Sequence, residues 1–451
     1  QSRTILSVIS LVSYVLTKVA VTVYAGGLVF QQVFGIKELW GIDFFWIAAI
    51  GLVVLTALYT IFGGMKSVLY TSVLQTPILL LGSLIILVLG FKELGGWDEM
   101  MRVCGAVTVN DYGDTMTNLI RSNDDANFPW LGALIGSAII GFWYWCTDQF
   151  IVQRVLSGKN EKEARRGTIF GAYLKLLPVF LFLIPGMIAF ALHQKYIGAG
   201  GEGFLPMLAN GTANADAAFP TLVAKLLPAG VKGLVVCGIL AALMSSLASL
   251  FNSSAMLFTI DFYKRFRPET PEKKLVGIGQ IATVVIVILG ILWIPIMRSV
   301  GDVLYTYLQD VQSVLAPGIA AAFLLGICWK RTSAQGGMWG LIAGMVIGLT
   351  RLGAKVYYSN AGEVADSTFK YLFYDMNWLF FCGWMFLFCI IVVIVVSLAT
   401  EAPTAEKIQG LVFGTATKEQ KAATRASWDH WDIIHTAIIL AITAAFYWYF
   451  W

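Results

Sequence analysis

The sequence predicts an all-α integral membrane protein that crosses the bilayer many times. Of the 451 residues, 58% are hydrophobic and only 13% are charged, a balance that water-soluble globular proteins do not have. The hydrophobic residues gather in repeated windows of about 20 residues, the length that an α-helix needs to cross the hydrocarbon core. Most of the basic residues lie between these windows, where positively charged loops set the orientation.

Eleven windows are apolar and long enough to form transmembrane helices. They are residues 4–33, 43–62, 67–92, 129–153, 168–193, 231–263, 275–297, 302–329, 335–350, 379–399 and 432–451. With Arg3 on the cytoplasmic side, the connections rich in Lys and Arg fall in the cytoplasm, and the acidic loop 93–128 is external. We therefore expect a multi-pass protein of the plasma (inner) membrane.

The residue pattern does not favour an enzyme or a nucleic-acid-binding protein. The six cysteines occur singly, without the spacing of a disulfide framework or a zinc site. We find no nucleophile with a partner base, no histidine cluster and no phosphate-binding loop. The net charge of +4 says little, because the position of basic residues relative to the membrane matters more than their sum.

The segment from Gly141 to Arg154 puts five aromatic residues, an acid and an arginine in or beside one transmembrane window. Polar groups at such depth cost several kcal/mol unless they face a bundle interior or a watery cavity. Because each residue of a helix turns by about 100°, the rings of Trp143, Tyr144 and Trp145 cannot all face lipid. An inward ring can stack on the apolar face of a sugar, although aromatic residues near an interface are more often membrane anchors.

A cluster of small oxygen-bearing residues lies in the middle of window 231–263. Ser245 and Ser246 carry adjacent hydroxyls, and a freed carbonyl at Ala242 would add a third oxygen. Hydroxyl and carbonyl oxygens without a carboxylate favour a weakly held monovalent cation such as Na⁺. The alternative is that these serines permit close helix packing or bond to their own helix.

Two further polar residues lie within transmembrane windows. Lys175 is too deep to reach the interface easily, so it either donates to substrate hydroxyls or forms an ion pair, for which Asp148 is a candidate. Gln309 offers donors and acceptors, which suit a polyhydroxylated substrate, but an interhelical hydrogen bond would use the same groups.

Six segments resemble one family of transporters. Trp143–Arg154 closely resembles the core signature of the sodium/glucose cotransporters, a branch of the sodium:solute symporter family. The other five, in the order of that family, are residues 172–178, 219–223, 243–253, 258–261 and 323–330. The resemblance extends to about Leu398.

The resemblance implies a LeuT-like transporter fold built from two inverted repeats of five helices. Residues 1–92 would then be three remaining helices of the first repeat, 93–128 an extracellular loop, 129–330 the second repeat, and 331–451 peripheral C-terminal helices. One broken helix is expected near 129–154. Its counterpart, with further sodium ligands, is expected before Gln1 and is missing from this sequence.

The resemblance also assigns roles to the candidate residues. It implies that Na⁺ is held by Ala242, Ser245 and Ser246. Tyr144 would close over the sugar as a gate, supported by an inner polar network of Asp148, Gln149 and Arg154. The residues expected to contact substrate are Gly141, Tyr144, Trp145, Lys175, Gln309 and, as a weaker candidate, Tyr14.

Three departures from the family pattern affect the expected function. Ser72 replaces the carboxylate associated with ion coupling, and Ala248 replaces a hydroxyl found where a second sodium site exists, so we expect one Na⁺ per substrate. Gly141 stands where a polar side chain often contacts sugar, which leaves the hexose open. The predicted function is sodium-coupled symport of a neutral sugar, such as glucose or galactose, or a related polyol. Alternatives are symport of myo-inositol, sialic acid or an amino acid, or a sugar-gated sensor or channel.

Overall fold

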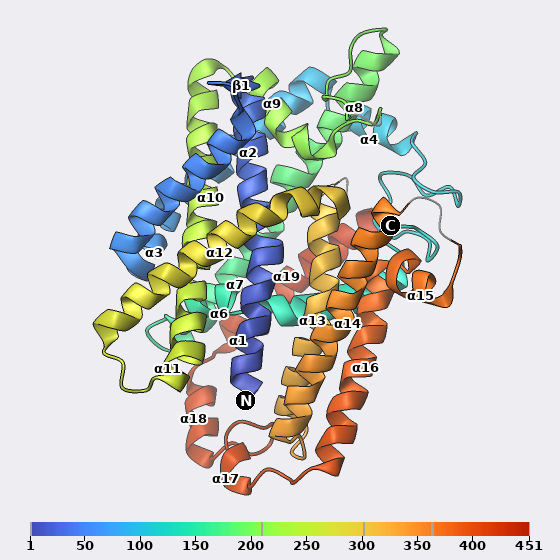
Figure 1. Ribbon diagram of the computed structural model, residues 1–451. Coiled ribbons are helices and arrows are strands. Elements are labelled where there is room, and N and C mark those ends of the chain that lie inside the picture. Colours follow the sequence, from blue (N-terminus) through green and yellow to red (C-terminus); the bar gives the residue numbers. More distant parts are fainter. Residues whose placement is uncertain (1, 209–210, 301–302, 362–364, 451) are drawn as a thin grey trace. The chain divides into compact units, whose positions relative to one another are not determined.

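A computed structural model describes residues 2–208, 211–300, 303–361 and 365–450 (Figure 1). Its elements are helices apart from one short hairpin, in which β1 (Glu38–Leu39) pairs antiparallel with β2 (Ile42–Asp43). In these described ranges ten helices are long and apolar enough to cross a membrane. The predicted multi-pass, all-helical class is therefore confirmed. Residues 302 and 451, at the limits of two predicted windows, lie outside the described residues.

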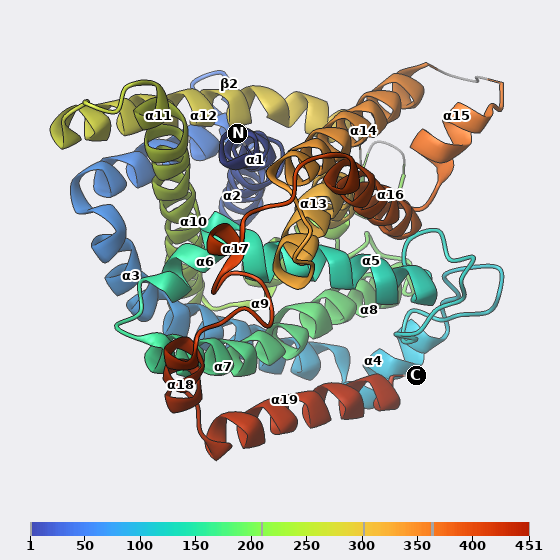
Figure 2. The ribbon, with the colours of Figure 1, turned by 90° about the horizontal axis from the view of Figure 1, so that it is seen from below.

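The difference between eleven predicted windows and ten helices arises at α3 (Phe44–Leu94). This helix joins predicted windows 43–62 and 67–92 without an intervening loop. Among the residues of α3 whose side chains are described, Gln75–Leu94 is long enough to cross and Phe44–Leu58 is a shorter apolar stretch. A straight helix of 51 residues would measure about 77 Å, more than twice the hydrocarbon thickness. In Figure 2 the ribbon of α3 changes direction along its length.

The chain divides into two compact units, which are described separately. Unit 1 comprises Gln1–Thr17, Arg121–Gly171 and Ser253–Ile442, and unit 2 comprises Lys18–Ile120, Ala172–Asn252 and Thr443–Trp451. Four elements belong partly to each unit: η1 (Tyr14–Val19), α7 (Glu161–Pro178), α10 (Ala229–Met256) and α19 (His430–Tyr449).

Unit 1 is built around three long helices, α13, α14 and α16, which pack against one another, with α5 against α13 and α16. Its helices are α1 (Ser2–Ser13), α5 (Trp130–Phe142), α6 (Gln149–Leu156), α11 (Lys264–Phe266), α12 (Glu272–Val300), α13 (Leu304–Cys328), α14 (Ala334–Asn360), α15 (Thr368–Lys370), α16 (Trp378–Ala399), α17 (Ala405–Ile408) and α18 (Lys418–Ala426). Its π-helical turns are η2 (Trp143–Thr147), η5 (Leu257–Tyr263) and η6 (Tyr371–Asp375).

Close packing in unit 1 depends on a row of glycines at four-residue spacing on α14. A side chain at Gly344 would come within 2.8 Å of the Cα of Gly318 on α13, and one at Gly336 would meet the carbonyl of Val393 on α16 at 2.8 Å. Small residues at this spacing let membrane helices approach closely, which favours van der Waals packing between them. Gly318 is a packing position within continuous α13.

Unit 2 packs α3 against α2, α8 and α9, with α4 against α8. Its remaining elements are α2 (Ala20–Phe34), α4 (Trp97–Gly105), α8 (Ile184–Gly198), α9 (Ala218–Leu226), the π-helical turn η3 (Val179–Leu183) and the 3₁₀ turn η4 (Ala215–Ala217). Buried apolar residues of α3, α4, α8, α9 and α10 form its core. Positive-φ glycines Gly35 and Gly95 end α2 and α3, a conformation that glycine adopts without steric cost.

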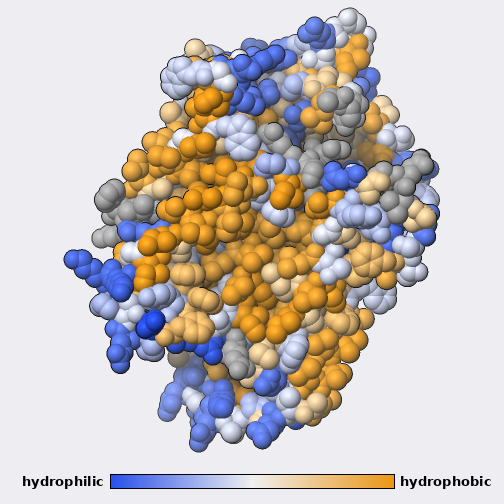
Figure 3. All heavy atoms as spheres, in the orientation of Figure 1, coloured by the Kyte–Doolittle hydropathy of each residue, from blue (hydrophilic) through white to orange (hydrophobic). Residues whose placement is uncertain are grey.

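The hydrophobic exterior of α12 agrees with contact to lipid. Figure 3 shows hydrophobic residues gathered over this helix. Among the large apolar side chains that it exposes are Val276, Ile281, Val284, Val285, Ile288, Leu289 and Leu292. Such a surface is stable in hydrocarbon but would be costly in water.

Candidate functional site

The helix predicted over 129–153 is interrupted. α5 ends in the π-helical turn η2, the chain is extended at Asp148 (φ −75°, ψ 119°), and α6 begins at Gln149. The Asp148 carboxylate caps α6 by accepting a hydrogen bond from the backbone N–H of Phe150 at 3.2 Å. The expectation of a broken helix is therefore confirmed, and the break is stabilised by the acid that the sequence places there.

Tyr14 is joined to this break. Its hydroxyl donates to the carboxylate of Asp148 at 2.8 Å and accepts from the N–H of Phe150 at 3.1 Å. Tyr14 is fully buried and Asp148 is 5% exposed. Tyr14, which is distant in the sequence, and Asp148 thus both accept from the N–H of Phe150, a group that the interruption leaves without a helical partner.

The aromatic residues of the segment lie on the π-helical turn itself. Trp143 is buried, Tyr144 is half-buried and Trp145 is 50% exposed. The rings of Tyr144 and Trp145 contact edge to face, with centroids 5.2 Å apart. In the described ranges, apart from the chain neighbours and the backbone of its own helix, no heavy atom lies within 4 Å of the position that a Cβ on Gly141 would occupy. π-helical turns are frequent at functional sites, and this one follows Gly141 within one helical turn.

The other expected members of the inner network lie on α6. Gln149 is half-buried, and the guanidinium of Arg154 lies over the ring of Phe150, 5.5 Å from its centroid. Sequence reasoning missed Gln153, which is buried and donates to the backbone carbonyl of Phe150 at 3.3 Å. Its spacing of four residues from Gln149 was the available signal.

Gln309 is half-buried on α13 in unit 1. Its amide donates to the hydroxyl of Tyr305 at 2.9 Å, one turn earlier on the same helix. The interhelical hydrogen bond considered as an alternative is therefore not what holds this amide. The Gln309 carbonyl oxygen accepts no hydrogen bond in the described ranges, so it is free to accept from a ligand.

The expected sodium residues lie on α10 within unit 2. The hydroxyl of Ser245, which is 8% exposed, lies 2.6 Å from the hydroxyl of Ser72 on α3, and Ser246 is half-buried. α10 is continuous through Ala242, so the expected freed carbonyl is not observed. That oxygen keeps a second lone pair, because a helical hydrogen bond uses only one of the two.

Lys175 lies on α7 in unit 2 and is exposed, whereas the other expected substrate residues belong to unit 1. The ion pair between Lys175 and Asp148 stays a prediction, because these residues belong to different units. In the described ranges no group of three His, Cys, Asp or Glu side chains could hold a metal ion.

An ion pair explains why the motif residues 258–261 end in an acid. Asp261 on η5 accepts a hydrogen bond from Nε of Arg3 at 2.7 Å and one from Ser7 at 3.0 Å. This pair ties α1 to the π-helical turn η5 within unit 1. Asp261 therefore connects α1 to η5 at the predicted cytoplasmic ends of the two helices.

Sequence reasoning also missed a buried charge cluster in unit 1. Asp310 on α13 bonds to Lys355 at 2.5 Å and lies 3.7 Å from Arg351, both on α14. Arg351 is completely buried, with its guanidinium over the ring of Phe381 at 4.0 Å. The predicted window 335–350 ended before these bases because isolated charges are costly in a membrane. α14 continues to Asn360 because the negative charge of Asp310 compensates the positive charges of Arg351 and Lys355.

The comparisons with known proteins point to a single family. Residues 1–344 match the sodium:solute symporter family. The chain is 35% identical to the sodium/mannose cotransporter of Bos taurus, over 99% of this chain and 77% of that protein. It is 35% identical to sodium/myo-inositol cotransporter 2 of Homo sapiens, over 91% and 62%, and 37% identical to sodium/glucose cotransporter 1 of Ovis aries, over 88% and 61%. The chain thus spans about three fifths of the length of the latter two relatives.

A solved structure shares the fold. It is the substrate-bound, outward-open state of a Na⁺-coupled sialic acid symporter, with a TM-score of 0.62 and 20% identity over 89% of this chain and 76% of that one. Helices, broken segment and likeness together define a LeuT-like membrane transporter rather than an enzyme. The chain belongs to the sodium:solute symporter family.

Proposed function

We propose that the protein couples the entry of one Na⁺ to the uptake of a neutral sugar or related polyol across the plasma membrane, by alternating access. The observation that carries this proposal is identity of 35–37% with relatives named as sodium/mannose, sodium/myo-inositol and sodium/glucose cotransporters, over about nine tenths of the chain. The substrate class common to these names is a neutral polyhydroxylated ring.

The sodium ion is bound by oxygen atoms of α10. Ser245 and Ser246 supply hydroxyls, and Ala242 supplies the second lone pair of its carbonyl. The hydroxyl of Ser72, 2.6 Å from that of Ser245, supports an all-oxygen environment without a carboxylate, which suits a weakly held monovalent ion. Ala248 provides no hydroxyl for a second ion, so the proposed stoichiometry is one Na⁺ per substrate.

The sugar is recognised by hydroxyl-reading and ring-stacking residues. The carbonyl oxygen of Gln309 accepts no hydrogen bond from the described residues, and Lys175 has donors for sugar hydroxyls. Trp145 stacks on the sugar and Tyr144 acts as the gate, while the open space at Gly141 admits ligand. Tyr14 acts as the support of the break at Asp148 and lies at the edge of this site.

The gate rests on the interrupted helix. Asp148, Gln149 and Arg154 form the inner network that fixes its orientation. In this proposal residues 1–92 belong to the first inverted repeat and 129–330 to the second, with 93–128 as an external loop and 331–451 as peripheral helices. Movement of one sodium charge through a membrane potential of 100 mV contributes about 2.3 kcal/mol to substrate accumulation.

The test is uptake by the purified full-length protein in liposomes under an inward Na⁺ gradient. The substrates are radiolabelled glucose, galactose, mannose, myo-inositol, sialic acid and a neutral amino acid, with K⁺ replacing Na⁺ as the control. We expect accumulation of at least one neutral sugar or polyol with Na⁺ alone, abolished when the gradient is collapsed. Uptake only of sialic acid or of the amino acid would overturn the substrate class. Sugar-dependent current without matching sugar uptake would indicate a sensor or channel instead.

A further inference from the structure

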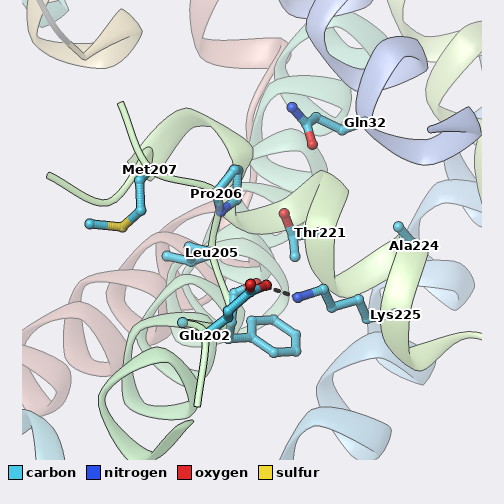
Figure 4. A pocket seen from close by; sticks show the side chains of 10 residues that line it. Gln32, Glu202, Leu205, Pro206, Met207, Thr221, Ala224 and Lys225 are labelled. Atoms are coloured by element: carbon cyan, nitrogen blue, oxygen red, sulfur yellow. Dashed lines mark hydrogen bonds between the residues drawn. The ribbon is translucent and has the colours of Figure 1, made fainter. Parts of the chain in front are cut away.

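A pocket of about 490 Å³ lies within unit 2, apart from every residue assigned above to sodium or substrate (Figure 4). Gln32 near the end of α2 lines one side. The segment 202–207 lines another, and Thr221, Ala224 and Lys225 on α9 close it. In the predicted orientation, these elements lie on the external side of the membrane. The volume is in the range of sites for small molecules.

The wall formed by segment 202–207 is held in place by specific contacts. The backbone N–H of Leu205 donates to Nδ1 of buried His193 at 3.0 Å, and a side chain at Gly203 would collide with that imidazole. Lys225 donates to the carbonyl of Phe204 at 2.7 Å, the dashed line in Figure 4, and its ammonium lies 4.7 Å from the Phe204 ring centroid. The pocket is therefore preformed, which lowers the entropic cost of binding.

Polar groups without partners line this preformed pocket. Thr221 is only 5% exposed, yet its hydroxyl makes no hydrogen bond to any residue that the structure describes. Figure 4 shows that hydroxyl directed toward the side of the pocket where Gln32 lies. The side chains of Gln32 and Glu202 likewise have no hydrogen bond within the described ranges. A ligand hydroxyl in the pocket would form a hydrogen bond with the accessible Thr221 oxygen, which contributes about 0.5–1.5 kcal/mol.

The charges and surfaces of the lining select the chemistry of that ligand. Lys225 and Glu202 have opposite signs, so either one disfavours a ligand of its own charge. The ammonium of Lys225 keeps two N–H donors, and the carboxylate of Glu202 offers only acceptors. The side chains of Thr221 and Gln32 can both donate and accept hydrogen bonds. Leu205, Pro206 and Met207 add apolar surface. We propose that this pocket is a second, sodium-independent binding site for a small neutral polyol on the external side. Its ligand class rests on the proposed function.

The test measures ligand binding in the absence of sodium. Saturation-transfer NMR on the purified full chain in choline buffer would compare glucose, mannose and myo-inositol with gluconate and glucosamine. We expect binding of at least one neutral compound and of neither charged one. Thr221→Val keeps the shape of the side chain and should weaken binding about tenfold, the size of one lost hydrogen bond. Thr56→Val is the matched control, because Thr56 is buried in the same unit and bonds only within its helix.

A second pair of variants tests the basic side chain. Lys225→Met should weaken sodium-free binding, and Lys232→Met should not, although Lys232 also bonds to a backbone carbonyl, that of Ala224. If Thr221→Val fails to fold, Gln32→Leu provides the same test.

The outcomes separate this inference from the proposed function. Sodium-free polyol binding that Thr221→Val weakens supports the pocket even if liposomes show no coupled uptake. Coupled uptake without sodium-free binding overturns the pocket and leaves the proposed function intact. Equal binding by wild type, Thr221→Val and Lys225→Met, or preference for a charged compound, also overturns it.

Discussion

The hydroxyl oxygens of Ser72 and Ser245 lie 2.6 Å apart and join α3 to α10 beside the proposed sodium ligands. The family resemblance places a carboxylate at the position of Ser72. A hydroxyl pair at this distance is a neutral hydrogen bond, whereas a carboxylate there would add a full negative charge next to the ion. The contact therefore offers a direct way to test how charge at this position sets sodium affinity.

Ser72→Asp should lower the Na⁺ concentration for half-maximal sugar uptake about tenfold, because a carboxylate is a stronger ligand for a hard cation than a hydroxyl. Sodium titration of uptake in liposomes measures it. Ser72→Asn is the matched neutral control and should not lower that concentration. An equal effect of both variants would show that charge at Ser72 does not act on the ion.

Ser245→Ala should raise the Na⁺ concentration for half-maximal uptake about tenfold, because one oxygen ligand is lost. The control is Ser254→Ala on the same helix, since the buried hydroxyl of Ser254 has no hydrogen-bond partner among the residues that the structure describes. The same sodium titration serves both variants. If the two variants shift the titration equally, Ser245 is a packing residue and not a ligand.

Tyr14→Phe should destabilise the protein by about 1–3 kcal/mol, because it leaves the buried Asp148 carboxylate without the 2.8 Å hydrogen bond from the phenol. Thermal unfolding in detergent measures the change. Tyr447→Phe, at a half-exposed side chain, is the control and should leave the transition where it is. An unchanged transition in Tyr14→Phe would mean that the break is held by the cap at Phe150 alone.

Asp310→Asn should lower the free energy of unfolding by about 3–5 kcal/mol, because Lys355 and the fully buried Arg351 would lose their negatively charged partner. Asp366→Asn removes an acid from an exposed pair with Lys370 and should have no measurable effect, since water screens such pairs. Thermal unfolding again compares them. Equal unfolding temperatures for the two variants would contradict a structural role for the buried charge cluster.

The cysteines should differ in reactivity with maleimide. Burial raises the pKa of Cys104, outside the transmembrane helices, to about 11. Because the thiolate is the reactive form, only a very small fraction of Cys104 is ionised at pH 8, and this fraction rises as the pH approaches 11. Exposed Cys146, next to Trp145 on η2, should label much faster and be protected by substrate. Mass spectrometry of labelled peptides would measure both. Equal labelling of Cys104 and Cys146 would contradict the burial.

Part of the candidate site could be predicted from the sequence because each signal was local. The acid at Asp148 follows three aromatic residues, and the structure breaks the helix there. The pairing of Asp148 with Tyr14 could not be predicted, because it joins residues 134 positions apart. The same limit applies to Asp310. Its charge was visible, but the buried Arg351 that balances it lies on another helix.

The sequence by itself determined that the chain is a helical membrane protein and which family it resembles, because apolar length and ordered motifs are properties of contiguous residues. Only the tertiary structure decided that α3 is one continuous helix, that α10 is unbroken at Ala242, and which hydroxyls meet at Ser72 and Ser245. The glycines of α14 show the reason. Their spacing can be read from the sequence, but which atoms lie beside each glycine depends on how a neighbouring helix packs.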